Sequence, residues 1–166
     1  GALNLDGNSW AEVHENASID ISDCSLEAWV YPLPETIGTW QTIFSKVDQA
    51  NLQIYLNPSD QLRHYNSTTA ETILDSTPFN KNEWNHFICV EDGSDVRTYV
   101  NGVLQSTKTI SLQMDSDGDF SIGSKPDILA DEIAAQIAQP RIYNRALSAE
   151  EVKALYDLEK PEAKPG

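Results

Sequence analysis

Short runs in which apolar and polar residues alternate, separated by turn-forming residues, dominate this sequence. SLEAWVYP at residues 25–32 alternates in this way, and QTIFSKV, NLQIYL, QLRHYN and WNHFICVED follow it along the chain. A period of two gives each strand one apolar face, and a second sheet must cover that face. The sequence therefore predicts an all-β sandwich or barrel.

The clearest local feature is a β-hairpin in the second half of the chain. Within residues 96–106, two strand-like runs flank Asn101 and Gly102, the preferred pair for a tight type I′ turn. A later strand is expected from AAQIAQPRIYN at residues 134–144. Because Pro140 has no amide hydrogen to donate, it predicts a β-bulge or a sheet edge in this strand.

Only the C-terminal region has a helical pattern. Ser148 is in place to be the N-cap, and Glu151 stands three residues later, which makes a capping box. Val152, Leu155 and Tyr156 then repeat at helical spacing on one face. We therefore expect one helix that packs through this face.

Length and composition indicate one domain followed by a tail. A chain of 166 residues is the size of one ordinary domain and can bury a sizeable core. The last residues, EKPEAKPG, are rich in proline and charge and have no large apolar side chain. We expect one domain over residues 1–158 and a linker or tail over residues 159–166, typical of a domain excised from a longer protein.

The charge balance excludes one class of partner. The chain has 26 acidic and 11 basic residues and a formal net charge of −15, whereas nucleic-acid binding needs a basic patch. No apolar run is long enough to span a membrane, and no secretory apolar region is present. We therefore expect no nucleic-acid partner and no membrane insertion.

The two cysteines, Cys24 and Cys89, do not form a CxxC pair, which argues against a zinc site. Both fall in strand-like apolar runs, where a thiol commonly behaves as a small apolar side chain. A disulfide between them would require Cα atoms within about 7 Å. The sequence leaves both states open.

The order of motifs resembles one known family. ALNLDGNSWAEV, EAWVYP, WNHF with DG and YVNG, and RIYNRALSAEEV occur in the order found in laminin G-like domains of the concanavalin A-like jelly-roll superfamily. The resemblance runs from about Ala2 to Tyr156. It implies a two-sheet antiparallel jelly-roll sandwich with a short C-terminal helix, in which one sheet is concave and the first and last strands are neighbours.

The resemblance also implies a class of function. Members of this family are mostly non-catalytic modules that bind glycans or proteins outside cells. We therefore expect a glycan-binding or adhesive module of an extracellular, cell-surface or virion protein, with a glycan or a protein surface as partner. The alternatives are a purely structural or assembly domain without a small-molecule ligand, and an accessory domain of a glycoside hydrolase.

The sequence lacks the patterns that catalysis requires. Glycoside hydrolases of related fold present their carboxylates on one strand as Glu-x-Asp-x-Glu, and the chain has no such run. Glu91 and Asp92 are adjacent in a strand and therefore face opposite sides. His14, His64 and His86 have no metal-ligand spacing. We expect a protein that is not an enzyme and that requires no cofactor.

A sugar site is expected to combine aromatic faces with a few polar groups. Trp29 and Trp84 match core positions of the family, whereas Trp10 and Trp40 lie next to turns. Further candidates come from the sheet that is concave in relatives. The candidate ligand-binding residues are Trp10, Trp40, Tyr55, His64, Tyr65 and Asn66.

Alternation limits how many of these residues can share one ligand. In RHYNSTT, residues 63–69, it places Arg63 and Tyr65 on one face and His64 and Asn66 on the other. At most half of this set can therefore contact one ligand. The competing interpretation is an exposed polar face of a sheet with no ligand.

Calcium-binding relatives hold the ion where the first and last strands meet, with an acidic side chain from the last strand. The corresponding position here is Ala138, which supplies none of the anionic oxygens that a hard divalent cation needs. A weakened site would combine Asp6 or Asn8 with Asp131 or Glu132. Calcium therefore remains an alternative to the expectation that no metal is required.

The stretch QMDSDGDF, residues 113–120, resembles the start of a calcium loop. An EF-hand loop needs its glycine after the third aspartate and a glutamate six residues later. Here Gly118 precedes Asp119, and the residue six positions after the glycine is Ser124. We interpret the stretch as an acidic turn between strands, in which Asp117 and Gly118 supply the positive φ.

Overall fold

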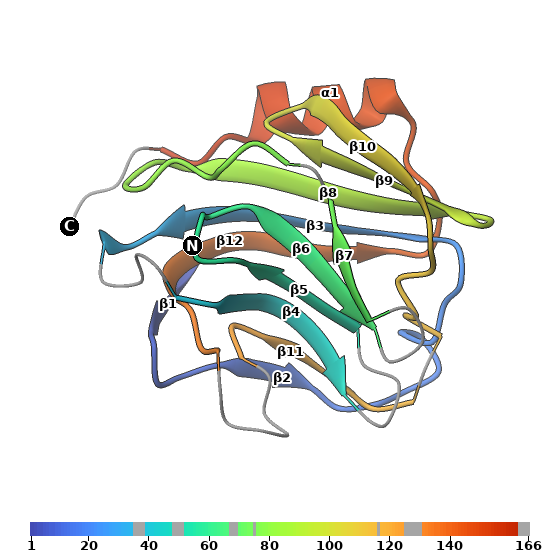
Figure 1. The fold of residues 1–166 in the computed structure, drawn as a ribbon, viewed down its shortest axis with the longest axis horizontal. Helices are drawn as coiled ribbons and strands as arrows, with labels where there is room; N and C mark the ends of the chain where they lie inside the picture. The colour runs from blue at the N-terminus through green and yellow to red at the C-terminus, as the bar shows by residue number, and fades with distance from the viewer. Residues whose placement is uncertain are drawn as a thin grey trace.

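The computed structural model describes residues 1–34, 39–47, 52–66, 70–74, 76–115, 117–124 and 131–162. These residues form two antiparallel β-sheets packed face to face, with one helix on the outside (Figure 1). The elements are β1 Ala2–Asp6, β2 Ala11–Val13, β3 Cys24–Pro32, β4 Gln41–Val47, β5 Leu52–Leu56, β6 Leu62–Asn66, β7 Ala70–Ile73, β8 Asn85–Asp92, β9 Asp95–Val100, β10 Val103–Thr109, β11 Asp119–Ile122, β12 Ala134–Tyr143 and α1 Ala149–Glu159.

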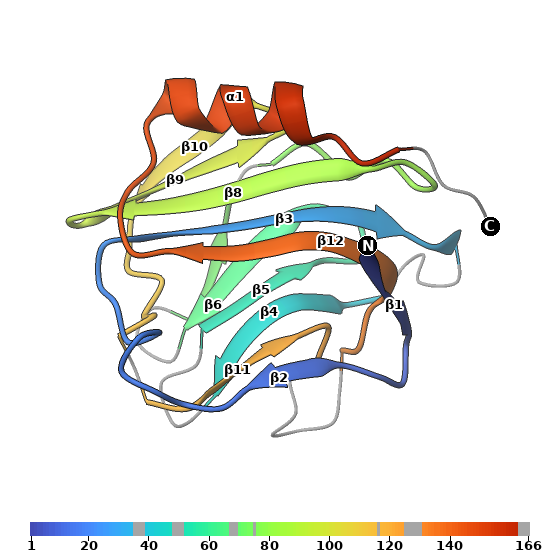
Figure 2. The same ribbon diagram turned by 180° about the vertical axis from the view of Figure 1, so that it is seen from behind.

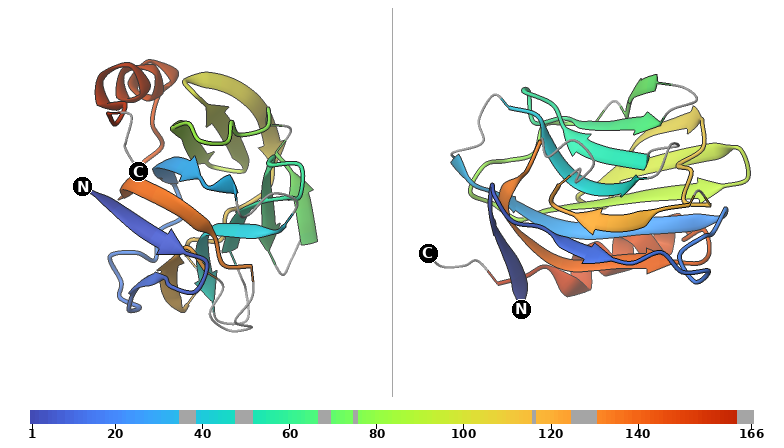
Figure 3. Two further views of the ribbon diagram at one scale, coloured as in Figure 1. Left: turned by 90° about the vertical axis from the view of Figure 1, so that its left-hand side faces the viewer. Right: turned by 90° about the horizontal axis from the view of Figure 1, so that it is seen from below.

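Sheet A has the strand order β1-β12-β3-β8-β9-β10, and sheet B has the order β2-β11-β4-β5-β6-β7. Figure 2 shows α1 beside sheet A, and the two turned views in Figure 3 show the layers edge-on. The expected all-β sandwich is confirmed, and the first and last strands are neighbours, since β1 pairs with β12. Within the described residues, none of the helices has the length and apolar character to cross a membrane.

Most strands lie where the alternating pattern predicts them, and two do not follow from it. The local pattern does not indicate β2 or β7, which are the edge strands of sheet B. They contain three and four residues. A strand of this length is too short to show a period of two, so the pattern gives no signal for it.

The two backbone irregularities that the sequence predicts are both present. Asn101 and Gly102 have φ values of 50° and 77°, as a type I′ turn requires. In β12 the register with β3 shifts between Ala138 and Arg141, and Gln139 adopts a φ of 50°. The expected bulge therefore lies immediately before the proline of this strand.

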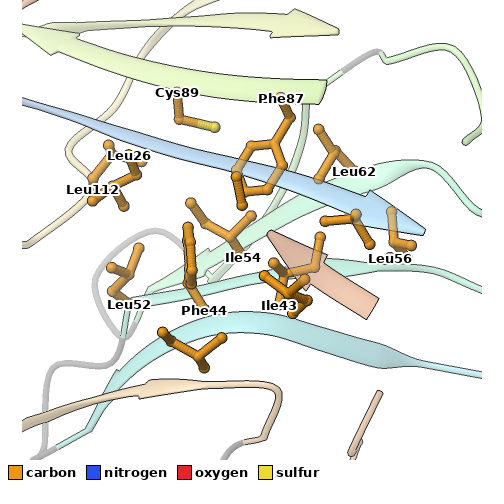
Figure 4. Packing of buried hydrophobic residues seen from close by; sticks show 14 of the residues in the cluster. Leu26, Ile43, Phe44, Leu52, Ile54, Leu56, Leu62, Phe87, Cys89 and Leu112 are labelled. Atoms are coloured by element: carbon orange, nitrogen blue, oxygen red, sulfur yellow. The ribbon is translucent and has the colours of Figure 1, made fainter. Parts of the chain in front are cut away.

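The main core lies between the sheets (Figure 4). Leu26 and Phe87 point inward from sheet A and meet Phe44 and Ile54 from sheet B. The rings of Phe44 and Phe87 lie 5.7 Å apart between centroids. Each of these side chains is fully buried, which stabilises the fold by about 1.5–3 kcal/mol per side chain.

The cysteines lie in this core as two free thiols. They sit on neighbouring strands, because Cys89 pairs with Leu26, two residues from Cys24. Burial raises the pKa of the Cys89 thiol to about 12 and also raises that of Cys24. Of the two states that the sequence leaves open, the structure contains the reduced one.

A second, smaller core lies between sheet A and α1. The sheet contributes Ile88, Val90 and Tyr99 from its outer face, and the helix contributes Val152. The predicted capping box fixes the start of the helix, since Ser148 accepts from the amide of residue 151 and the glutamate there returns the bond. Sheet A is therefore covered on both faces, by sheet B and by the helix.

A network of polar side chains lies within this second layer around Glu27, which is fully buried. Its Oε1 lies 2.8 Å from Nε2 of His86, and its Oε2 accepts from the Tyr143 hydroxyl at 2.6 Å. Arg141 Nη1 approaches the same carboxylate at 3.4 Å and binds Glu159, the last residue of α1, at 2.5 Å. The network therefore connects three strands of sheet A to the C-terminal end of the helix.

The electrostatics of Glu27 show that the network compensates for burial. Burial alone would raise the pKa of this carboxyl group, but the hydrogen bonds from His86 and Tyr143 outweigh it and lower the pKa. A buried carboxylate is tolerated when its oxygens are paired in this way. The ionised form is therefore the one that the fold stabilises.

Two contacts extend the packed structure beyond the domain boundary that the sequence predicts. Gln139 Nε2 donates to the carbonyl oxygen of Glu159 at 3.3 Å, and Trp84 Nε1 donates to that of Glu162 at 3.1 Å. Residues 159 and 162, which fall in the expected linker or tail, thus contact the packed domain. Backbone carbonyl groups anchor this segment, so its lack of apolar side chains does not indicate the contact.

Lys46 holds the acidic stretch before β11 in place. Its side chain is fully buried, and Nζ donates to Asp20 Oδ1 at 2.5 Å and to the carbonyl oxygens of Ile19 at 3.2 Å and Met114 at 2.8 Å. Gly118 adopts a φ of 114°, and β11 begins at the next residue. The described residues of QMDSDGDF before Asp119 lie between strands, as predicted, and Asp119 and Phe120 begin β11.

His64 is part of the core between the sheets. Its side chain is fully buried on β6, and neither ring nitrogen has a hydrogen-bond partner of normal geometry among the described residues. Burial lowers the pKa of the imidazole to about 4, and the backbone of Leu112 opposes this change only in part. The neutral imidazole is therefore the form that the native state holds.

Glu27→Ala should destabilise the protein by about 3–5 kcal/mol, because it leaves Arg141 and His86 without their buried partner. Glu27→Gln keeps the shape of the side chain and should cost less. The measurement is the free energy of unfolding in urea. The exposed Glu83→Ala serves as control and should change it by less than about 0.5 kcal/mol. A Glu27→Ala variant as stable as the wild type would contradict the structural role of the network.

Acid should destabilise the protein through His64. A histidine with a pKa of about 6.5 when unfolded and about 4 when folded contributes stability that is fully present above pH 6.5 and is lost as the pH falls toward 4. Between pH 7 and pH 4 the free energy of unfolding of the wild type should fall by on the order of 3 kcal/mol more than that of His64→Leu. Urea unfolding of both proteins at the two pH values measures this difference, and equal losses would overturn the assignment.

Candidate functional site

A shallow hollow of about 230 Å³ lies on the face of sheet B that points away from sheet A, called here the outer face of sheet B. Trp40 stands at its rim with 43% of its surface exposed. Its ring lies 5.6 Å from that of Tyr55, which is buried beneath it. The hollow is lined by Trp40, Gln53, Tyr55, Tyr65 and Asp131.

The register of sheet B brings these side chains together. Gln53 pairs with Tyr65 across β5 and β6, and Tyr55 lies two residues along on the same face. The amide of Thr42 donates to the carbonyl oxygen of Asp131 at 2.6 Å, which fixes the segment before β12 beside β4. Trp40 precedes β4 directly, so the loop residue and the strand residues meet at this point.

The chemistry of the hollow suits a polar ligand with an apolar face. Gln53 Nε2 donates to the Thr42 hydroxyl at 2.8 Å, which orients the amide and leaves its oxygen as an acceptor. The carboxylate of Asp131 adds further acceptors. An exposed aromatic face next to a few fixed polar groups is the usual composition of a small-ligand site.

The structure brings together three of the six predicted ligand residues, Trp40, Tyr55 and Tyr65. Trp10 is exposed to a similar degree, 40%, but it precedes β2, which β11 and β4 separate from β5. Trp10 is therefore outside the hollow.

His64 and Asn66 are also outside the hollow, because β6 turns them toward sheet A. Both are fully or almost fully buried, and Asn66 donates to the carbonyl oxygen of Ser111 at 2.9 Å. The alternation that separates them from Arg63 and Tyr65 is confirmed. These two predicted residues therefore lie on the opposite face from the hollow, because successive side chains of a strand point to opposite sides.

Two residues of the site region are missing from the predicted set. Gln53 lies on the same strand face as Tyr55, and Arg63 pairs with Tyr55 across β6. The alternation in NLQIYL and QLRHYN contains this signal. Asp131 enters the hollow from a loop, where no periodic pattern indicates its position.

The predicted metal ligands occupy different surroundings. Asp6 Oδ1 accepts from the amide of Asn8 at 2.9 Å and from the Ser9 hydroxyl at 2.8 Å, and the Ser9 bond is the main cause that lowers its pKa. Asp131 contributes to the hollow instead. Ala138, where calcium-binding relatives carry an acidic residue, is buried against Trp29 and Trp84. The side chains packed around it are aromatic.

Among the residues that the structure describes, one group of three closely spaced possible metal ligands occurs, Glu12, His14 and Asp119. Nδ1 of His14 lies 3.2 Å from Asp119 Oδ2 and 3.8 Å from Glu12 Oε1. All three are on the surface, and the direct contact between His14 and Asp119 accounts for the approach without an ion. Asp119 belongs to QMDSDGDF, so one carboxylate of this acidic stretch contacts the histidine that follows β2.

A buried pair among the described residues has the composition of a catalytic acid and base. Glu27 and His86 lie 2.8 Å apart, but both are fully buried beneath α1. Trp29 and Tyr156 lie against the His86 ring, with centroids 4.6 and 6.0 Å away. The pair therefore has no access for a substrate in this conformation, and its role is structural.

Solved structures with the same fold are similar to nearly the whole chain. Domain 4 of an extracellular GH43 arabinanase from Geobacillus stearothermophilus, in complex with arabinotriose, has a TM-score of 0.76 and 21% sequence identity. The alignment covers 93% of this chain and 76% of that one. The binding domain of Paraclostridial Mosquitocidal Protein 1 has a TM-score of 0.72 and 20% identity, with coverage of 93% and 42%.

Botulinum neurotoxin type C, whose cell entry depends on interaction with two ganglioside molecules, is a third such structure. It has a TM-score of 0.67 and 16% identity, and the alignment covers 89% of this chain and 39% of that one. The chain thus spans about two fifths of the toxin chains it resembles. At these identities the likeness establishes the fold alone.

No similar sequence was found among curated proteins. The laminin G-like family model of the concanavalin A-like lectin/glucanase superfamily, however, matches residues 5–153, most of the chain. This match agrees with the two-sheet architecture and with the predicted resemblance. The protein therefore belongs to the concanavalin A-like lectin/glucanase superfamily as a laminin G-like domain.

Proposed function

We propose that this protein is a non-catalytic glycan-binding module and that the hollow on the outer face of sheet B is its binding site. The observation that carries the proposal is the exposed ring of Trp40, supported from below by Tyr55, beside Tyr65 and two polar side chains. An aromatic face of this kind packs against the apolar face of a sugar ring, while Gln53 and Asp131 accept hydrogen bonds from its hydroxyl groups.

Structural relatives support a binding role. One similar domain was solved with arabinotriose, and another belongs to a toxin that interacts with gangliosides. Both ligands contain sugars, and both relatives use the same two-sheet scaffold. We extend this to a location outside cells, on a secreted, cell-surface or virion protein, because the ligands of such a module are presented there.

An assembly domain is the second candidate, and one observation favours it. β10 is the edge strand of sheet A, and Val103 and Leu104 on it are largely exposed. An unpaired edge with apolar side chains can pair with another chain. Stable self-association in light scattering, combined with no binding on a glycan array, would favour assembly and reject the lectin function.

Replacing Trp40 by alanine should weaken glycan binding about tenfold or more, because the loss of an aromatic anchor typically costs 1–3 kcal/mol. Glycans selected on an array, followed by calorimetry with each variant, provide the measurement. Trp10→Ala is the matched control, since Trp10 is exposed to a similar degree but lies outside the hollow. A loss of binding in Trp10→Ala with full binding in Trp40→Ala would place the site elsewhere.

Binding should be insensitive to a metal chelator. A hard divalent cation needs several anionic oxygens, and Asp131 is the one carboxylate among the described residues that line the hollow. Calorimetry should give equal affinities in about 5 mM calcium chloride, which saturates a weak calcium site, and in about 5 mM EDTA, which removes the ion. A loss of binding in EDTA would show that a cation takes part and would reject this prediction.

A further inference from the structure

Arg63 is a basic residue at the border of the hollow, and no partner for it occurs among the residues that the structure describes. It lies on β6 between two residues that point into the core, so its side chain is on the outer face of sheet B. It pairs directly with Tyr55 and stands two residues from Tyr65. Directly paired side chains lie about 4.5–5.5 Å apart at Cβ, which places Arg63 next to the aromatic floor of the hollow.

The guanidinium group of Arg63 has unused hydrogen-bonding capacity. Its Nε and Nη1 atoms are buried and have no hydrogen-bond partner among the residues that the structure describes. The residue as a whole remains partly exposed. A buried donor without a partner costs free energy, and a ligand, an ion or an ordered water molecule can supply the missing acceptor.

Within the described residues, Arg63 differs from the other arginines in having no acidic partner. The chain carries 26 acidic residues and 11 basic ones, so most basic side chains should have a carboxylate nearby. The other three arginines each have one within the described structure. These pairs are Arg97 with Asp92, Arg141 with Glu159, and Arg145 with Glu151.

We infer that Arg63 binds an acidic substituent, a carboxylate or a sulfate, on the glycan that packs against Trp40 and Tyr65. This inference rests on the proposed function of the hollow. Arginine presents several donors in a planar fork, which matches the oxygens of both anionic groups.

The two sides of the hollow differ in charge, and this difference orients the ligand. Asp131 lies beside β4 and Arg63 lies on β6, with β5 between them. The acidic substituent belongs at the β6 side, and sugar hydroxyl groups that donate to Asp131 belong at the β4 side. Gln53 stands between them on β5.

The net charge of −15 restricts the ligand further. A polymer with an anionic group on every sugar would be repelled by the surrounding carboxylates, whereas one acidic group paired with Arg63 is screened from them over about 8 Å at physiological salt. The ligand class is therefore a glycan with a single or sparse acidic residue, and dense polyanions such as heparin are expected to bind poorly.

The test uses matched glycan pairs on an array. Glycans that end in N-acetylneuraminic acid, end in glucuronic acid or carry a galactose 6-sulfate are each compared with the neutral parent. The wild type should bind at least one acidic glycan about tenfold more tightly than its parent, the usual effect of one charged hydrogen bond. The pair that responds distinguishes a carboxylate from a sulfate, and heparin should give no stronger signal.

Calorimetry with the selected pair then isolates Arg63. Arg63→Gln should lose the preference, so that it binds the acidic glycan no more tightly than the neutral parent. Arg63→Lys should keep part of the preference, and Arg97→Gln, the control, should keep all of it. Trp40→Ala should weaken binding to both members of the pair by the same factor.

The outcomes separate the inference from the function on which it rests. Equal binding of both glycans by the wild type, lost in Trp40→Ala, would overturn the role of Arg63 and leave the glycan-binding function standing. An equal loss for both glycans in Arg63→Gln would also overturn it, since that result indicates a structural role. No binding to any glycan would reject the proposed function together with the inference.

Discussion

The paired carboxylate of Glu27 is the interaction on which the arrangement of the whole molecule depends. Its bonds to His86 and Tyr143, and the link through Arg141 to Glu159, allow polar groups to lie in the layer between sheet A and α1. That layer covers the outer side of sheet A, while sheet B covers the inner side. Both faces of sheet A are therefore used for stability, and the proposed ligand site lies on the outer face of sheet B.

Much of the fold could be predicted from the sequence, because its signals are local. A period of two, an Asn-Gly turn and a capping box each depend on residues within a few positions of one another, and all three appear in the structure. β2 and β7 could not be predicted, since so few residues show no period. The docking of residues 159–162 could not be predicted either, because it depends on carbonyl groups that every residue possesses.

Only part of the candidate site could be predicted, because strand register and a loop bring its residues together. Trp10 and Trp40 have the same local character and nearly the same exposure, and only the strand order separates them. Alternation correctly divides Tyr65 from His64, but it does not say which face is covered by the other sheet. Asp131 reaches the hollow through its backbone contact with β4, a long-range contact that the sequence does not encode in any short pattern.

The buried amine of Lys46 has a consequence for the acidic stretch QMDSDGDF. In a calcium loop, the conformation follows the concentration of a diffusible ion. Here the positive group that the carbonyl oxygen of Met114 contacts is covalently part of β4, so it is present at a fixed ratio of one per molecule. The contact at Met114 therefore persists for as long as sheet B is folded, whatever the concentration of ions in solution.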